Sequence, residues 1–170
     1  MSYNAIEEVI EMKQKELSRW LKAILVLAVA AGLITLLVLV PAFGRSTVLT
    51  YPEYAFLYMP CLLFIWLSGI PFFAAIGYAW RVCGELARDN SFTADNARRV
   101  KRISQLALLE CPLYLLGAVL LMCWNALHPG VLILIFGVIF LCAAVSAAFA
   151  AMSHFIGKGA ALKSENDLTV

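Results

Sequence analysis

The sequence of 170 residues has little charge: charged side chains make up 14% of it and hydrophobic ones 63%. An ordinary soluble domain has roughly 25% charged residues. Apart from one glutamate, four stretches have no charged side chain, at residues 23–44, 54–80, 103–128 and 129–157. About 20 helical residues cross the hydrocarbon core of a bilayer. The composition therefore excludes an ordinary soluble domain and predicts an all-α integral membrane bundle of four transmembrane helices.

The chain also lacks the patterns of common catalytic and metal sites. It has no Cys-x-x-Cys pair, no glycine-rich phosphate loop after a strand, and no nucleophile with a nearby base. Its two histidines, His128 and His154, fall at opposite ends of the last span and cannot share a metal. We therefore expect no enzyme activity, no metal and no cofactor. Five cysteines without paired spacing favour packing as small hydrophobes, and a Cys61–Cys123 disulfide stays open.

Lysine and arginine are distributed unevenly along the chain. They cluster before the first span, between spans two and three, and after span four, whereas Arg45 alone follows span one and none follows span three. Basic residues favour the cytoplasmic side, so both termini and the middle loop are predicted to be cytoplasmic. The predicted segments are a helix at 1–19, spans at about 20–43, 54–80, 103–127 and 130–157, a loop at 81–102 and a tail at 158–170.

The first apolar stretch is expected to be an anchor that stays in the membrane. About 19 residues of mixed charge precede it, and its apolar run exceeds the 7–15 residues usual for a signal-peptide core. Residues 41–44, Pro-Ala-Phe-Gly, are predicted to stop this helix. The preceding segment has an Ile/Leu stripe at helical spacing, which suits either a solvated helix leading into the span or a surface for a cytoplasmic partner.

The middle loop is the most patterned polar segment. Thr93 is predicted to cap a new helix, with Asp95 in its first turn. Four basic residues follow just before the membrane: Arg98, Arg99, Lys101 and Arg102. They suit three roles: fixing the orientation of the chain, binding anionic lipid headgroups, or contacting an acidic protein surface. Because no recognition helix accompanies them, we expect no direct binding of nucleic acid.

The residues of this loop are similar to a known signature. Ser91-Phe92-Thr93, then Asn96-Ala97-Arg98-Arg99 and the basic residues up to Ile103, resemble the loop of a bacterial family of four-span membrane proteins, domain of unknown function 2975. The ending, with Asp167-Leu168-Thr169 before a β-branched residue, also resembles the family. The resemblance implies a location in the bacterial cytoplasmic (inner) membrane. It also implies a helix-turn-helix regulator as a cytoplasmic partner, and it supplies no catalytic residues.

The tail suits two arrangements. It is either a disordered end or a segment that packs back on the middle loop, where Asp167 would meet the basic residues. In the second case loop and tail form one binding surface for a partner or for lipid headgroups. Its members would be Phe92, Thr93, Asn96, Arg98, Arg99, Lys101, Arg102, Asp167 and Leu168.

Glu110 is the one charged residue inside a predicted span. Acidic groups there are costly, so they face protein or water and merit a functional hypothesis. Pro112 and Pro71 each free a backbone carbonyl at a similar depth. We therefore predict an intramembrane polar pocket of Glu110, Ser146, Ser68, Pro71 and Pro112. Glu110 is either a protonated, hydrogen-bonded packing residue or a site that responds to protons, cations or a small ligand.

Small residues follow one another at helical spacing in span four, at Ala143, Ala147 and Ala151 with Cys142, Ser146 and Ala150 alongside. Such a face permits close helix approach in lipid, either inside the four-helix unit or between copies of the chain.

The function that we predict is that of a regulatory or interaction protein holding a cytoplasmic partner through its loop and tail. The alternative is a small oligomeric transporter or channel that uses Glu110.

Overall fold

The computed structural model describes the backbone of residues 3–88 and 91–167 and the side chains of residues 12–88 and 91–166. Its secondary structure is entirely helical in these ranges. The elements are α1 (Tyr3–Ile34), the π-helical turn η1 (Thr35–Leu39), α2 (Val40–Thr50), the short 3₁₀ helix η2 (Pro52–Leu57), α3 (Tyr58–Leu86), α4 (Ala94–Cys123) and α5 (Pro129–Asp167). The predicted all-α class is confirmed.

Four helical segments are long and apolar enough to cross a membrane: Met12–Thr50, Pro52–Leu86, Ala94–Cys123 and Pro129–Asn166. The chain is therefore a four-span integral membrane protein. Large apolar side chains are exposed along all of these helices, including Leu27, Leu63, Leu116 and Phe140. In a bilayer such surfaces face lipid tails, so their exposure is the expected condition of the folded protein.

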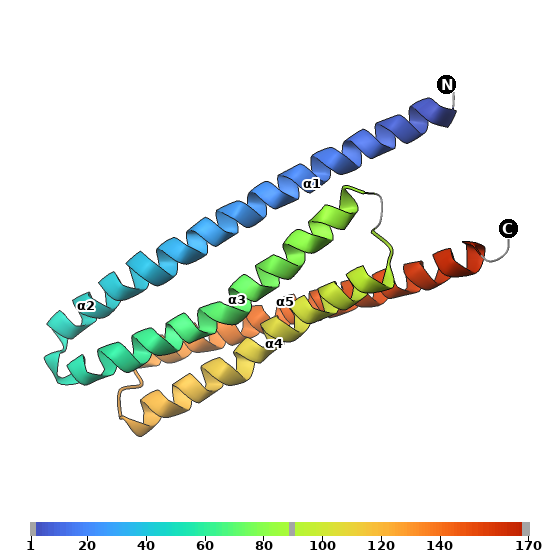
Figure 1. The fold of residues 1–170 in the computed structure, drawn as a ribbon. Coiled ribbons are helices and arrows are strands. Elements are labelled where there is room, and N and C mark those ends of the chain that lie inside the picture. Colours follow the sequence, from blue (N-terminus) through green and yellow to red (C-terminus); the bar gives the residue numbers. More distant parts are fainter. Residues whose placement is uncertain (1–2, 89–90, 168–170) are drawn as a thin grey trace.

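The spans run up and down (Figure 1). The start of α1, the α3–α4 connection and the end of α5 lie at one end of the molecule, here called the terminal end. The α2–α3 and α4–α5 connections lie at the other, here called the hairpin end. This arrangement agrees with termini and middle loop on the same side of the membrane. The assignment of the terminal end to the cytoplasm rests on the basic residues and stays a prediction.

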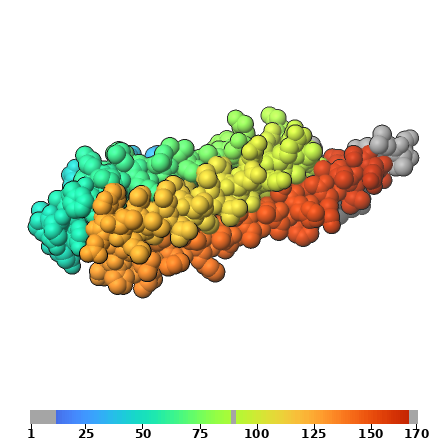
Figure 2. All heavy atoms as spheres, turned by 90° about the horizontal axis from the view of Figure 1, so that it is seen from below, coloured from blue at the N-terminus to red at the C-terminus, as the bar shows by residue number. Residues whose placement is uncertain are grey.

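The helices pack in series, each against the next span along the chain. α4 and α5 are the closest pair, followed by α3 with α4 and α1 with α3, and in the described ranges α1 does not bring its Cα atoms within 8 Å of α4 or α5. The molecule is correspondingly long and narrow, with α3, α4 and α5 lying along one visible face (Figure 2). α1 is consequently the least enclosed of the spans.

The first helix does not stop at residues 41–44, as the sequence had suggested. It continues from α1 through η1 into α2 and ends at Thr50. The π-helical turn lies directly before Pro41, and the Val40 N–H donates to the Thr35 carbonyl instead of to Leu36. A proline in an α-helix lacks an N–H and its ring clashes with the carbonyl four residues earlier. The wider turn accommodates Pro41, so the helix goes on.

One predicted helix start is confirmed, and the tail differs from both arrangements considered for it. α4 begins at Ala94, directly after its predicted cap Thr93. α5 continues as a helix to Asp167, so residues 158–167 neither fold back nor lack structure. The interior prolines Pro71 and Pro112 lie within unbroken helices. Helix ends are therefore set by caps and tertiary contacts here rather than by the limits of the apolar runs.

Candidate functional site

Thr93 begins α4 as the sequence predicts. Its backbone is extended, at φ −129° and ψ 152°, and its side-chain oxygen accepts a hydrogen bond from the Asn96 N–H at 3.2 Å. Asp95 lies in the first helical turn, where a negative charge interacts favourably with the helix dipole. The polar residues of the signature therefore have a local structural role at the entry to α4.

Asn96 is fully buried, with 0% of its surface exposed. Its Nδ2 donates to the Ser91 carbonyl at 3.2 Å, and its Oδ1 accepts from an Arg99 guanidinium nitrogen at 3.0 Å. Arg99 in turn forms an ion pair with Glu85 of α3 at 3.6 Å, with both side chains partly buried. These residues brace the α3–α4 connection, and the buried Asn96 side chain contacts the chain itself rather than a partner's surface.

The connection is also fixed to α5. The Ser153 hydroxyl donates to the Ala97 carbonyl at 2.7 Å. The Phe92 ring covers Gly159, where a Cβ would lie only 2.6 Å from the ring's Cδ1 atom. Phe92 nevertheless remains 57% exposed. The signature residues therefore join three helices at the terminal end and leave one aromatic side chain at the surface.

Three basic residues of the predicted cluster stay exposed: Arg98, Lys101 and Arg102. Their spacing of three and four places them on one face of α4. Arg98 pairs with Asp95 at 3.1 Å, with side chains 78% and 70% exposed, and such a solvated pair contributes little. Arg102 approaches Gln105 at 3.5 Å. Together with Phe92 these three residues form what we call the basic face.

The predicted contribution of the tail lies outside what the structure describes. Leu168 is beyond the described residues, and the side chain of Asp167 is also outside them. The α5 backbone continues past the α3–α4 connection toward the terminal end (Figure 1). As far as Asp167, therefore, the chain leads away from the basic residues of α4.

The predicted intramembrane pocket forms differently from the expectation. Ser146 shares a hydrogen bond of 3.1 Å with Ser104, and Ser68 approaches the Tyr114 hydroxyl at 3.3 Å while donating to the Ile65 carbonyl at 2.9 Å. Neither serine forms a hydrogen bond with Glu110. The expected hydrogen bonds of Glu110 to Ser146 or to a proline-freed carbonyl are therefore absent from the described residues.

Glu110 is buried, with 8% of its surface exposed, and neither carboxyl oxygen has a hydrogen-bond partner in the described part of the chain. The Tyr114 hydroxyl and the Cys142 thiol lie close enough to the Glu110 carboxyl to interact with it electrostatically. Buried polar groups are nearly always paired, so an unpaired carboxyl requires an explanation. Residues 12–88 and 91–166 bring no three His, Cys, Asp or Glu side chains together as metal ligands.

The alanine face of α5 does not pack inside the molecule. Ala143, Ala147 and Ala151 are exposed, whereas Cys142, Ser146 and Ser153 face α4 or lie partly buried. The two serine hydroxyls bond to α4 and thereby set the rotation of α5. Of the two alternatives for the alanines, packing inside the four-helix unit is not observed, and a contact between copies stays a prediction.

Sequence reasoning missed several residues that join the helices. Ser18 is buried and donates to the Cys83 carbonyl at 2.6 Å, and Trp66 donates to the Leu36 carbonyl at 2.9 Å. Ser104 and Tyr114 supply the partners of Ser146 and Ser68. A seven-residue spacing on α4, at Ala97, Ser104 and Cys111, is a sequence signal that could have revealed the contact between α4 and α5. All five cysteines, Cys61 and Cys123 included, are free thiols.

The comparison with known proteins agrees with this layout. Residues 42–170 match the protein family of unknown function DUF2975. The chain belongs to this family. It is also similar to the uncharacterized membrane protein YoaS of Bacillus subtilis (strain 168), with 24% identity over 153 residues that cover 89% of this chain and 96% of the relative. No solved structure matches the chain. The resemblance in the middle loop is confirmed at the level of the family.

Proposed function

We propose that this DUF2975 protein is a non-enzymatic membrane protein of the bacterial cytoplasmic membrane that holds a cytoplasmic protein partner on its basic face. The supporting observation is a separation of roles among the signature residues. Asn96 and Arg99 take part in hydrogen bonds that brace the connection, while Phe92 just before α4 and Arg98, Lys101 and Arg102 on α4 remain exposed. A braced loop presents these side chains at little entropic cost, which favours binding.

The chemistry of this surface indicates the kind of partner. Aromatic and arginine side chains dominate binding energy at protein interfaces, and basic residues accelerate encounters with acidic surfaces. The partner is therefore a protein with an acidic patch and an apolar pocket for Phe92. A helix-turn-helix regulator is the identity that the family resemblance implies, and such a complex would keep the regulator at the membrane.

The test is photo-crosslinking in cells from a photoreactive residue at position 92. The control places the same photoreactive residue at position 49, where the natural Leu49 is 83% exposed at the hairpin end. One cytoplasmic protein is expected from position 92 and none from position 49. Crosslinks from position 92 only to lipid, or only to the protein itself, would overturn the proposal.

The captured protein is then purified and its affinity measured for the wild type and for a variant with Arg98, Lys101 and Arg102 changed to glutamine. Binding is expected to weaken by about ten-fold or more, since three exposed charges that each contribute roughly 0.5–1 kcal/mol together supply about 1.5–3 kcal/mol. The orientation of the variant in the membrane is checked with a reporter on the C-terminus. Unchanged affinity in a correctly oriented variant would contradict a role for these charges.

A second function, a small oligomeric transporter or channel, is supported by the unpaired carboxyl of Glu110. Intramembrane carboxyl groups commonly take part in proton or cation movement. The test is flux in proteoliposomes, where Glu110→Gln is expected to abolish transport and Glu53→Gln, an exposed carboxyl at the hairpin end, to leave it unchanged. Absence of proton or cation flux in the wild type would exclude this function for those substrates.

A further inference from the structure

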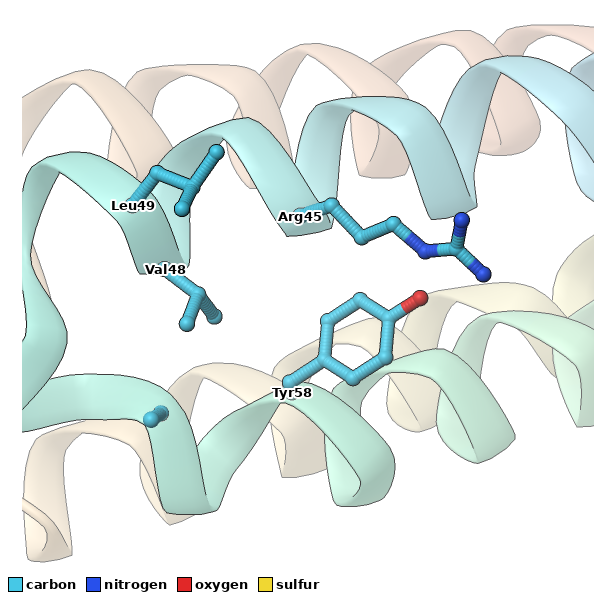
Figure 3. A pocket seen from close by; sticks show the side chains of 5 residues that line it. Arg45, Val48, Leu49 and Tyr58 are labelled. Carbon is cyan, nitrogen blue, oxygen red and sulfur yellow. The ribbon is translucent and has the colours of Figure 1, made fainter.

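A cleft of about 330 Å³ opens at the hairpin end between α2 and the start of α3 (Figure 3). Its lining consists of Arg45, Val48 and Leu49 from α2, Ala55 from η2 and Tyr58 from α3. The volume is at the lower end of the range of ligand-binding pockets. The walls are mostly apolar, and the polar groups on them are a guanidinium and a phenol hydroxyl. These two polar groups suit an anion.

Arg45 is the one lysine or arginine between residues 23 and 80, and residues 103–157 contain none. It is therefore the sole permanent cation at the hairpin end. The side chains of Arg45 and Tyr58 both line the cleft, Arg45 from α2 and Tyr58 from α3 (Figure 3). In the described part of the chain the Arg45 side chain has neither an ion pair nor a hydrogen bond, and the exposed Glu53 of η2 does not pair with it. Five guanidinium N–H donors are thus available to an anion.

Because α2 continues past the predicted stop at residues 41–44, Arg45 lies within the helix and not in the loop that follows it. The helix ends at Thr50, five residues after Arg45, so Arg45 lies about 7.5 Å below the helix end at 1.5 Å per residue. When the α2–α3 turn lies at the membrane surface, Arg45 is level with the lipid headgroups and the first carbons of the acyl chains. An anion at this depth in a membrane is most simply the phosphate of a lipid.

Gly44 allows the Tyr58 wall of the cleft to form. A Cβ at Gly44 would lie 2.8 Å from the Cε2 atom of the Tyr58 ring, closer than real contacts allow. The missing side chain lets the Tyr58 ring lie against α2, so the phenol lines the same cleft as Arg45.

We propose that this cleft binds the phosphate group of an anionic membrane phospholipid, whose acyl chains run from the phosphate toward the centre of the membrane. Arginine binds phosphate oxygens through paired N–H donors, and the tyrosine hydroxyl donates a further hydrogen bond. Val48 and Leu49 lie between Arg45 and the helix end at Thr50, so they border the outer part of the headgroup. This site is independent of the basic face, which lies at the opposite end of the molecule.

The test uses the full-length protein in nanodiscs of phosphatidylcholine that contain a small fraction of phosphatidylglycerol with a photoreactive group near its phosphate. After illumination, labelled peptides are quantified by mass spectrometry. Wild-type protein is expected to be labelled within residues 45–58. Arg45→Gln is expected to reduce that labelling about five-fold, the typical effect of one basic residue on anionic lipid binding. The matched control, Arg88→Gln, removes an equal charge at the terminal end and leaves it unchanged.

Two further variants separate binding from folding. Tyr58→Phe keeps the ring against Gly44 and is expected to lower labelling about two-fold through loss of the hydroxyl. Arg45→Lys keeps the charge without the planar guanidinium, and its labelling is expected to fall between those of the wild type and Arg45→Gln. Each variant is compared by size-exclusion chromatography and circular dichroism. If Arg45→Gln does not fold, the proposal is still tested by the order of labelling among the wild type, Arg45→Lys and Tyr58→Phe.

The outcomes distinguish the sources of the anion. Equal labelling of residues 45–58 by a phosphatidylcholine probe would show a cleft without charge selectivity and overturn the proposal. Equal labelling of the wild type and Arg45→Gln would also overturn the proposal. Displacement of the lipid probe by inorganic phosphate would assign the guanidinium to a free anion and overturn the lipid assignment. Labelling that resists phosphate and depends on Arg45 would support it.

Discussion

The indole N–H of Trp66 on α3 donates a 2.9 Å hydrogen bond to the backbone carbonyl of Leu36 in the first span. That carbonyl has lost its usual helical donor, because the Val40 N–H bonds to Thr35 and Pro41 has no N–H. In a bilayer no water can replace the missing donor. Trp66 therefore compensates for the π-helical turn that accommodates Pro41, and it links α1, the least enclosed span, to the rest of the molecule.

Trp66→Phe is expected to lower the free energy of unfolding by about 1–2 kcal/mol, because it leaves the Leu36 carbonyl unpaired. The measurement is thermal or denaturant unfolding in detergent micelles. Trp20→Phe is the control, since Trp20 is 72% exposed and should tolerate the change. The Trp66 change should cost less in a Pro41→Ala background, where the helix regains a backbone donor. Equal costs in both backgrounds would contradict this account.

The sequence predicts the four spans and the cap at Thr93 because both depend on local information. Charge-free runs define spans by length, and a threonine followed by an acidic residue defines a helix start. The passage of the helix through Pro41 could not be predicted in this way. It depends on a donor thirty residues away, on Trp66 of another helix.

The polar contacts inside the membrane were predicted less well for a similar reason. Depth can be counted along a span, so Glu110, Ser68 and Ser146 were expected at similar levels. The partner of each side chain depends instead on how α4 and α5 are rotated about their axes. Ser146 consequently bonds to Ser104, and Glu110 has no partner among the described residues.

Asn96→Ala is expected to destabilise the protein by about 1–3 kcal/mol, since it leaves the Ser91 carbonyl and a partly buried guanidinium without their partner. Proteolysis near residues 87–93 should become faster at the same time, and both effects can be measured on purified protein. Arg98→Gln is the control, because the exposed Arg98 should change stability by less than about 0.5 kcal/mol. A fully stable Asn96→Ala variant with impaired partner binding would instead assign Asn96 to recognition.

Ser146→Leu and Ala147→Leu provide a matched pair on adjacent positions of α5. Ser146 is buried against Ser104, so a leucine there overpacks the α4–α5 contact and should cost roughly 1–3 kcal/mol. Ala147 is exposed, so the same change should leave the unfolding of the monomer nearly unaffected. Analytical ultracentrifugation in detergent then tests the alanine face. Loss of a dimer in Ala147→Leu alone would place Ala147 at a contact between copies.

Glu110→Leu is expected to leave the stability unchanged or to raise it by about 1–3 kcal/mol. The carboxyl is buried without a hydrogen-bond partner in the described residues, and removing an unpaired polar group relieves its desolvation cost. Unfolding in detergent measures the change, with Glu53→Leu as the control for loss of an exposed carboxyl. A marked loss of stability in both Glu110→Leu and Glu110→Gln would indicate that Glu110 has a partner in the membrane, such as a second copy of the chain. Retained stability, by contrast, would mean that folding does not require this carboxyl, so that a proton, a cation or a small ligand becomes the reason for its presence.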